Sequence, residues 1–358
     1  MRLRDSGVSP GRRCCGCIRL AVPPFSAVEL QGQPRLPHEE FQVENIALLD
    51  TSFRSENDGD RIIVEAIHDQ FPAIGGAPSI PTHVPMRWHS RRLAHRSKLL
   101  AVTGTNILSR DIFSMRQWPL RPRDISAMEG KVVFCGVGWW QYQDDILEHT
   151  ADALKSMLLP DVPISARDQY TADKLTGVGI HSVNTGCPTM WGLPLTLPGV
   201  GHRDEVVFTL TNYNPAVKQD SLLVDWLLTR YQRVHVWPQS AKDERLLRRS
   251  KKRDRVNILD RGLSALESAL AGSDYVGTRL HAGIRAAQLG SPMVILAVDN
   301  RAIEIARDTG LPVLRRDDPL EVLDSGMVKL SQPQSMKLPH REIEEWKSKF
   351  TGALSAHL

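Results

Sequence analysis

The 358-residue sequence contains no apolar run that approaches the roughly 18 residues of a membrane-spanning helix. It also lacks a strong charge of either sign. Its formal net charge of +4 suits an anionic substrate or a membrane surface, but it is too small to indicate nucleic acid. These two absences predict a soluble or peripheral protein with no nucleic-acid partner.

Cysteine is scarce and odd in number. Of the five cysteines, only Cys135 and Cys187 fall where the sequence reads as ordered, which argues against a disulfide framework and favours a reducing, cytoplasmic compartment. The other three lie within residues 14–17, without the second pair that a zinc site requires, so we expect no metal. Residues 1–43 lack an apolar segment long enough for a signal peptide. They are interpreted as a disordered leader, or as the product of an upstream start codon that is not the native one.

A complete dinucleotide-binding fingerprint is missing too. Gly136 and Gly138 follow an apolar run at 131–135, but Gln141 stands where the third glycine of Gly-x-Gly-x-x-Gly is required. We therefore expect no dinucleotide site at this strand end.

What the sequence does contain is a regular alternation of short apolar runs and helical patterns. The apolar runs lie at 46–49, 99–102, 131–135, 162–166, 206–210, 234–237, 256–259, 275–276 and 293–298. Such alternation predicts an α/β fold with parallel sheets covered by helices on both faces. The length suits two domains rather than one.

The expected boundaries follow from this pattern. We expect an N-terminal α/β domain over residues 44–192, a Gly- and Pro-punctuated linker over 193–201 and a C-terminal α/β domain over 202–330. Residues 331–358 should supply a C-terminal helix that packs back on the N-terminal domain. Its apolar face would carry Ile343, Trp346, Phe350 and Leu354 at helical spacing.

Polar residues follow several of these runs, at the strand ends where parallel sheets bind ligands. Arg279 and His281 stand two residues apart where a helical pattern begins, after the apolar run Tyr275-Val276. A cation and an imidazole at a helix N-terminus make an anion site with an acid/base group beside it. The alternative is that both side chains only satisfy backbone groups at a crowded helix start.

Similar strand-end positions occur earlier in the chain. Asn57 and Asp60 follow the first apolar run, Asn106 follows the second and Arg167 follows the run at 162–166. The structural alternative for the first group is a tight turn with Asp58 or Asp60 as the helix cap, and for Arg167 it is a local ion pair with Asp168 and a helix cap.

Two other charged or titratable regions stay open. His83, His89 and His95 lie in a Pro- and His-rich stretch and are more typical of surface or packing residues than of catalysts. The basic run Arg245–Arg255 is typical of a solvated loop. The alternative is peripheral docking to a lipid-linked acceptor at the inner face of a membrane.

The ordered set of motifs resembles the polysaccharide pyruvyl transferase family over about residues 44–315. The motifs are Asn-Asp-Gly-Asp at 57–60, Thr-Gly-Thr-Asn at 103–106, Gly-Val-Gly at 136–138, Ser-Ala-Arg-Asp at 165–168, Asn-Thr-Gly-Cys-Pro-Thr at 184–189, Gly-Thr-Arg-Leu-His at 277–281 and Ile-Leu-Ala-Val-Asp at 295–299. The Arg-x-His strand end is the most specific of them.

The resemblance implies two Rossmann-like parallel-sheet domains facing a central cleft, as in glycosyltransferase-B-like folds. It also implies transfer of a pyruvyl group from phosphoenolpyruvate to two hydroxyls of a surface polysaccharide sugar or its lipid-linked precursor. A ketal forms and phosphate is released, with no cofactor and no metal. A homo-oligomer is compatible with this reading.

The residue roles follow from the same resemblance. His281 would act as general acid and base, Arg279 would bind the donor's phosphate or carboxylate, and Arg167 would assist from the facing domain. Asp60 would orient an acceptor hydroxyl or another cleft residue. Asn57, Asn106 and Thr278 are the further candidates for substrate binding.

Two rival functions remain open at this point. One is a nucleotide-sugar glycosyltransferase of similar architecture. The other is a non-catalytic member of the family that binds a glycan or scaffolds a polysaccharide assembly complex.

Overall fold

The computed structural model describes residues 45–114 and 117–358, which belong to one compact unit spanning Phe41–Leu358. The expected leader, residues 1–43, lies outside the described residues. Within the described ranges, no helix is both long enough and apolar enough to cross a bilayer.

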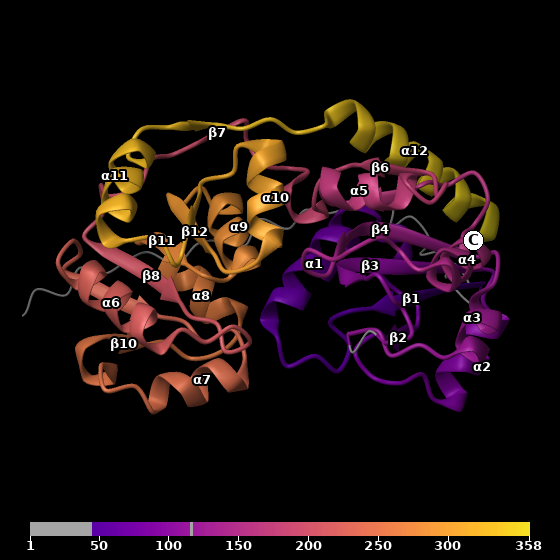
Figure 1. The fold of residues 1–358 in the computed structure, drawn as a ribbon, viewed down its shortest axis with the longest axis horizontal. Coiled ribbons are helices and arrows are strands. Elements are labelled where there is room, and N and C mark those ends of the chain that lie inside the picture. The colour runs from indigo at the N-terminus through magenta and orange to yellow at the C-terminus, as the bar shows by residue number, and fades with distance from the viewer. Residues whose placement is uncertain (1–44, 115–116) are drawn as a thin grey trace, which may run out of the picture. The chain divides into compact units, whose positions relative to one another are not determined.

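The first half of the unit is a six-stranded parallel sheet. Its strands are ordered β2-β1-β3-β4-β5-β6, and Figure 1 shows the helices that surround it. The strands are β1 (Ile46–Asp50), β2 (Ser79–Pro81), β3 (Leu99–Leu108), β4 (Val132–Trp139), β5 (Ile164–Ala166) and β6 (Ser182–Asn184). The helices are α1 (Asp58–Gln70), α2 (Trp88–Arg96), α3 (Pro122–Met128), α4 (Glu148–Met157) and α5 (Gln169–Thr176), with 3₁₀ turns at Pro72–Ile74 and Pro188–Met190.

Successive side chains of each strand point to opposite faces of this sheet. Ala47 and Leu49 pack with residues of α2, α3 and α4 in one core. Ile46 and Leu48, from the same strand, pack with α1 and with the C-terminal helix α12 (His340–His357) in another. Burial on both faces explains why the strands read as continuous apolar runs.

The second half repeats this architecture. Its parallel strands are ordered β10-β9-β8-β11-β12-β13. They are β8 (Glu205–Thr209), β9 (Arg233–Val236), β10 (Asn257–Ile258), β11 (Asp274–Gly277), β12 (Met293–Ala297) and β13 (Val313–Arg315). The helices are α6 (Val217–Leu228), α7 (Ala241–Arg248), α8 (Leu263–Leu270), α9 (Leu280–Gln288), α10 (Asn300–Thr309) and α11 (Leu320–Leu330), with a 3₁₀ turn at Arg253–Arg255. The predicted α/β class with two parallel-sheet domains is confirmed.

The C-terminal segment returns to the first sheet. β14 (Gln334–Ser335) pairs antiparallel with β7 (Thr196–Leu197). Beyond it, α12 places Trp346 in an aromatic cluster with Phe71, Trp191 and Phe350. The Trp346 indole nitrogen donates a hydrogen bond to the Pro163 carbonyl at 2.8 Å. The residue boundaries of the domains and linker stay predictions.

Two strands are longer than the sequence suggested. The apolar runs in the sequence end at residues 102 and 135, but β3 runs to Leu108 and β4 to Trp139, and both extensions are almost wholly buried. Gly104 and Thr105 take positive φ angles of 73° and 72°, and the pairing register of β3 with β4 shifts beyond Thr105. The polar residues and glycines that suggested a turn therefore mark an irregularity inside a strand.

The basic run Arg245–Arg255 covers the end of α7 and the following 3₁₀ turn. Arg248 pairs with Glu244 at 2.7 Å, and both Lys252 and Arg255 pair with Asp225. Such pairing is typical of a solvated surface. Docking of this run to a membrane or a lipid-linked acceptor stays a prediction.

Gly138 provides a test of packing in β4. A Cβ atom added there would lie 2.2 Å from Nε of the buried Arg167. We expect Gly138→Ala to lower the free energy of unfolding by about 1–3 kcal/mol through overpacking. Gly192→Ala is the matched control, since its Cβ would meet nothing within 4 Å. Denaturant unfolding that gave equal stabilities for the two variants would contradict this packing.

Trp346 tests the anchoring of α12. Trp346→Ala removes a side chain that is 1% exposed, and we expect a loss of about 3–5 kcal/mol in the free energy of unfolding. Lys349→Ala, on the exposed side of the same helix, should change it by less than about 0.5 kcal/mol. A loss below about 1 kcal/mol for Trp346→Ala would mean that α12 is not an integral part of the unit.

Candidate active site

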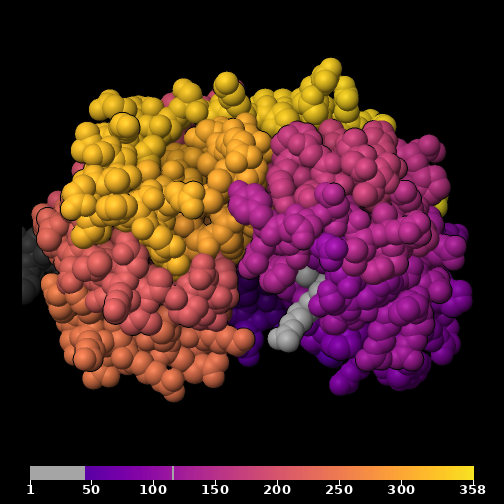
Figure 2. All heavy atoms as spheres, viewed as in Figure 1, coloured from indigo at the N-terminus to yellow at the C-terminus, as the bar shows by residue number. Residues whose placement is uncertain are grey.

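A pocket of about 510 Å³ lies where loops of the two sheets meet. In the first sheet the chain adds β2 on one side of β1 and β3 on the other, and in the second it adds β9 on one side of β8 and β11 on the other. The strand order therefore reverses at β1 and at β8. Ligands of open α/β sheets bind at such switch points, beyond the carboxyl ends of the strands. Figure 2 shows a hollow between the indigo-to-magenta and the orange halves of this face.

Both sheets contribute side chains to this pocket. Those from the first half include Ser55, Asn57, Asp60, His83, Thr105, Asn106, Gln117, Trp140 and Gln141. Those from the second half are Tyr213, Gln239, Lys242, Arg279, Leu280, His281, Asp299 and Arg301. Five of the seven predicted site residues line it, and Arg167 and Thr278 do not.

The second half of the pocket is built from the first turns of three helices. Lys242 lies in the first turn of α7, His281 in that of α9 and Arg301 in that of α10. Free backbone N–H groups at helix starts carry positive partial charge. Three of them around one pocket, with basic side chains, favour an anionic ligand there.

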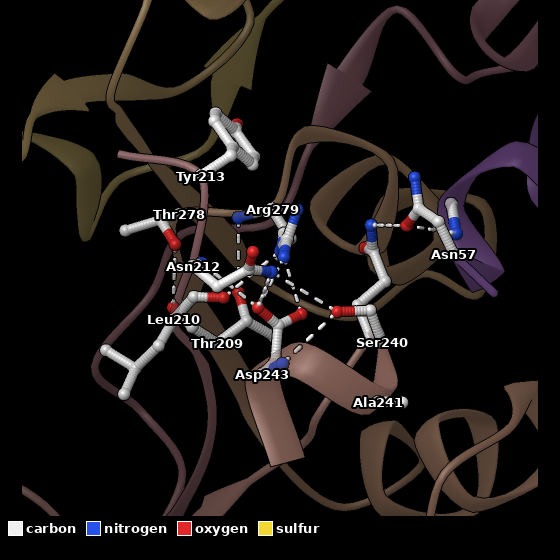
Figure 3. Close-up of polar contacts among 12 residues, drawn as sticks. Asn57, Thr209, Leu210, Asn212, Tyr213, Ser240, Ala241, Asp243, Thr278 and Arg279 are labelled. Carbon is white, nitrogen blue, oxygen red and sulfur yellow. Dashed lines mark hydrogen bonds and ion pairs between the residues drawn. The ribbon is translucent and has the colours of Figure 1, made fainter. Parts of the chain in front are cut away.

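Arg279 is held in a fixed orientation (Figure 3). Its Nη2 lies 2.5 Å from both carboxylate oxygens of Asp243, and its Nε donates to the Leu210 carbonyl at 3.1 Å. The guanidinium carbon also lies 5.0 Å from the centre of the Tyr213 ring. Asp243 balances the charge of Arg279, so this arginine supplies directed N–H groups more than net positive charge.

His281 is also buried, with 7% of the residue exposed. Its Nε2 lies 3.8 Å from Sγ of Cys187. Burial, together with the charges of Arg167 and Arg301, lowers the pKa of His281 to about 3. The imidazole is therefore neutral at physiological pH in the protein without ligand.

Arg167 lies behind the pocket wall. Its Nη2 donates to Oδ1 of Asn106, its Nε lies 3.3 Å from Asp168, and its side chain is 1% exposed. The absence of a side chain at Gly138 makes room for it. The prediction that Arg167 assists from the facing half can hold only through Asn106 and through its charge, because it does not reach the pocket.

Asn57 and Thr278 have structural partners. Asn57 caps α1 by accepting from the Gly59 amide, and it also accepts from Nε2 of Gln239 at 2.6 Å, which links the two halves. The Thr278 hydroxyl donates to the Thr209 carbonyl at 3.1 Å, and the residue is 3% exposed. The sequence suggested Asp58 or Asp60 near the N-cap of this helix, but the structure places Asn57 there, and Asn57 also lines the pocket.

Three basic or imidazole residues of the pocket were missed from the sequence. Arg301 is gripped by Asp299, with Nε 3.0 Å from each carboxylate oxygen, and it follows the buried run 293–298. That strand-end signal was the same one that pointed to Arg279. Lys242 follows β9 in the same way. His83 follows the three-residue strand β2, too short to recognise in the sequence.

The other two histidines of that stretch, His89 and His95, are exposed on α2 and do not line the pocket. Across residues 45–114 and 117–358, no three His, Cys, Asp or Glu side chains gather as metal ligands would.

The comparisons with known proteins give one family and several distant structural likenesses. The structure of UDP-GlcNAc 2-epimerase from Methanocaldococcus jannaschii is similar to this chain at 9% sequence identity, with a TM-score of 0.49. The match covers 87% of this chain and 99% of the epimerase chain. The glycosyltransferase SnogD of Streptomyces nogalater matches 87% of this chain and 98% of its own at 9% identity, with a TM-score of 0.32. A search of curated proteins finds no match. Residues 57–300, more than half of the chain, match the family model described as polysaccharide pyruvyl transferase, and the chain therefore belongs to the polysaccharide pyruvyl transferase family.

Proposed function

We propose that this pocket binds phosphoenolpyruvate and transfers its pyruvyl group to two hydroxyls of a sugar in a polysaccharide or its lipid-linked precursor. The observation that carries the proposal is the junction of three helix starts with Lys242, Arg279 and Arg301 in a chain of this family. Phosphoenolpyruvate carries a phosphate and a carboxylate, and both groups suit such surroundings.

The three cations have different tasks in this proposal. Arg279 and Arg301 are fixed by Asp243 and Asp299, so their remaining N–H groups orient the donor without needing to reorganise. Lys242 is exposed and has no ion-pair partner among the described residues, so it adds net positive charge. The helix starts add to the attraction.

His281 is the proposed proton carrier. Burial, together with the charges of Arg167 and Arg301, lowers the pKa of His281 and so keeps its imidazole neutral before the donor binds. A bound phosphoenolpyruvate brings negative charge beside it and so raises its pKa. The imidazole thus gains its proton when the donor arrives, and it can pass that proton to the donor's methylene carbon.

The facing half of the pocket is proposed to hold the acceptor. Asp60 and Asn106 line it, and Arg167 fixes the side chain of Asn106. Asn57 and Thr278 contribute by holding the loops in place. Arg167 acts as a positioning residue in this arrangement, and its buried charge also shapes the proton affinity of His281.

The reaction itself can be tested by phosphate release. The purified protein should release phosphate from phosphoenolpyruvate in the presence of at least one sugar of an acceptor panel, and His281→Asn should lower the rate by about 10²–10⁴-fold. His149→Asn is the control, because that histidine is exposed and does not line the pocket. Binding of a nucleoside diphosphate sugar with no response to phosphoenolpyruvate would favour the glycosyltransferase instead. Glycan binding without turnover would favour a scaffold.

Proton uptake tests the role of His281 in donor binding. Between about pH 6 and 8, phosphoenolpyruvate binding should take up a fraction of a proton, because a residue with a free-protein pKa of about 3 shifts upward on binding. Calorimetry in buffers of different ionisation enthalpy measures this uptake. His281→Asn should bind the donor with less uptake, while an uptake equal to that of the parent protein would place the proton elsewhere.

A further inference from the structure

We propose that Asp60 is the general base that receives the proton of the attacking acceptor hydroxyl, and that His83 is the residue that positions it. This inference rests on the proposed pyruvyl transfer and assigns the half-reaction that His281 does not cover. Its basis is the arrangement of Ser55, Asp60 and His83, which line the pocket from the first half of the chain.

Asp60 has one oxygen anchored and one oxygen available. Its Oδ2 accepts a hydrogen bond from the Ser55 hydroxyl at 2.6 Å and lies 3.5 Å from Nε2 of His83. Its Oδ1 accepts no hydrogen bond from the described residues, and it is not among the fully buried atoms that lack a partner. The residue as a whole is 7% exposed. Because Asp60 lines the pocket, this oxygen is where an acceptor hydroxyl could donate.

His83 has an oxygen atom near each ring nitrogen, although only Nδ1 is within hydrogen-bonding geometry of its partner. Nδ1 lies 3.1 Å from the Gln117 carbonyl, and Nε2 faces Oδ2 of Asp60. Only the imidazolium has a hydrogen on each nitrogen, so this environment favours the charged ring. Burial lowers the pKa of His83, but the contact with Asp60 and the backbone carbonyls of Gln117 and Thr51 outweigh it and raise the pKa.

The pKa values of the two imidazoles in the pocket are thus shifted in opposite directions. The pKa of His281 is lowered by burial and by Arg167 and Arg301, and that of His83 is raised. Environments that separate the proton affinities of titratable groups in one pocket are typical of a divided acid and base task. Asp60 is the charged group that acts on His83, whereas His281 lies among arginines.

The proton balance closes with these groups. As the first hydroxyl oxygen bonds to C2 of the donor, its proton passes to Asp60 and the proton of His281 passes to C3, which becomes a methyl group. The C2–O bond to phosphate then breaks, and the second hydroxyl oxygen bonds to C2 while its proton passes to His281. The proton held by Asp60 leaves with the phosphate. His83 keeps its own protons throughout and fixes the carboxylate.

Three variants separate these roles. Asp60→Asn should lower kcat for transfer by about 10²–10⁴-fold, while the dissociation constant of phosphoenolpyruvate changes less than about threefold. His83→Asn can still reach the Gln117 carbonyl but not Asp60, and it should lower kcat by about tenfold. His83→Gln can still donate to Asp60, and it should recover most of that loss. Asp69→Asn and His95→Asn, both exposed, are the matched controls.

The pH profile distinguishes positioning from a general loss of structure. In the parent protein the raised pKa of His83 means that its charge is present at lower pH and is lost as pH rises through that value. The rate should therefore fall on the alkaline side, where loss of the His281 proton also lowers it, and His83→Gln should change the position of this limb by removing the contribution of His83. Unchanged thermal unfolding of the variants would show that they fold.

The outcomes are separable. A parent protein that releases no phosphate with any acceptor overturns the proposed function. An active parent protein with Asp60→Asn within twofold of its rate overturns only the assignment of Asp60. Equal rates for His83→Asn and His83→Gln, with an alkaline limb in His83→Gln at the same pH as in the parent protein, overturn the positioning role of His83.

Discussion

The ion pair between Arg279 and Asp243 is the interaction on which the second half of the pocket depends. Arg279 starts α9 and Asp243 lies in the first turn of α7, and Asp243 also accepts hydrogen bonds from the backbone and side chain of Asn212. Through Leu210 and Asn212 the pair joins the loop after β8 to both helices. Removing one partner would leave the other charge buried and unpaired, which typically costs about 3–5 kcal/mol.

The same pair shows why a cation-rich pocket need not be strongly positive. Asp243 and Asp299 balance Arg279 and Arg301, and the arginines gain a fixed geometry in return. What remains to attract an anion is Lys242 and the starts of α7, α9 and α10. The arginine guanidinium groups would thus orient an anionic ligand, whereas Lys242 and the helix starts would attract it. It also leaves the neutral His281 sensitive to the charge of whatever enters the pocket.

Much of this arrangement could be predicted from the sequence, because parallel sheets place ligand residues at strand ends. That rule gave Asn57, Asp60, Asn106, Arg279 and His281, and all five line the pocket. It could not show that Arg167 lies behind the pocket wall, since that depends on the space left by Gly138 on a strand that extends beyond the apolar run. His83 escaped recognition because the strand before it has three residues, and its environment depends on Asp60, Thr51 and Gln117 from other segments.

The most direct test of the account is a crystal structure with phosphoenolpyruvate bound. The account predicts that the donor lies in the pocket between the two sheets. Its phosphate and carboxylate should be within hydrogen-bond distance of Arg279, Arg301 or Lys242, and its methylene carbon should face His281. Phosphoenolpyruvate bound outside this pocket, or bound there with its methylene carbon beyond the reach of His281, would contradict it.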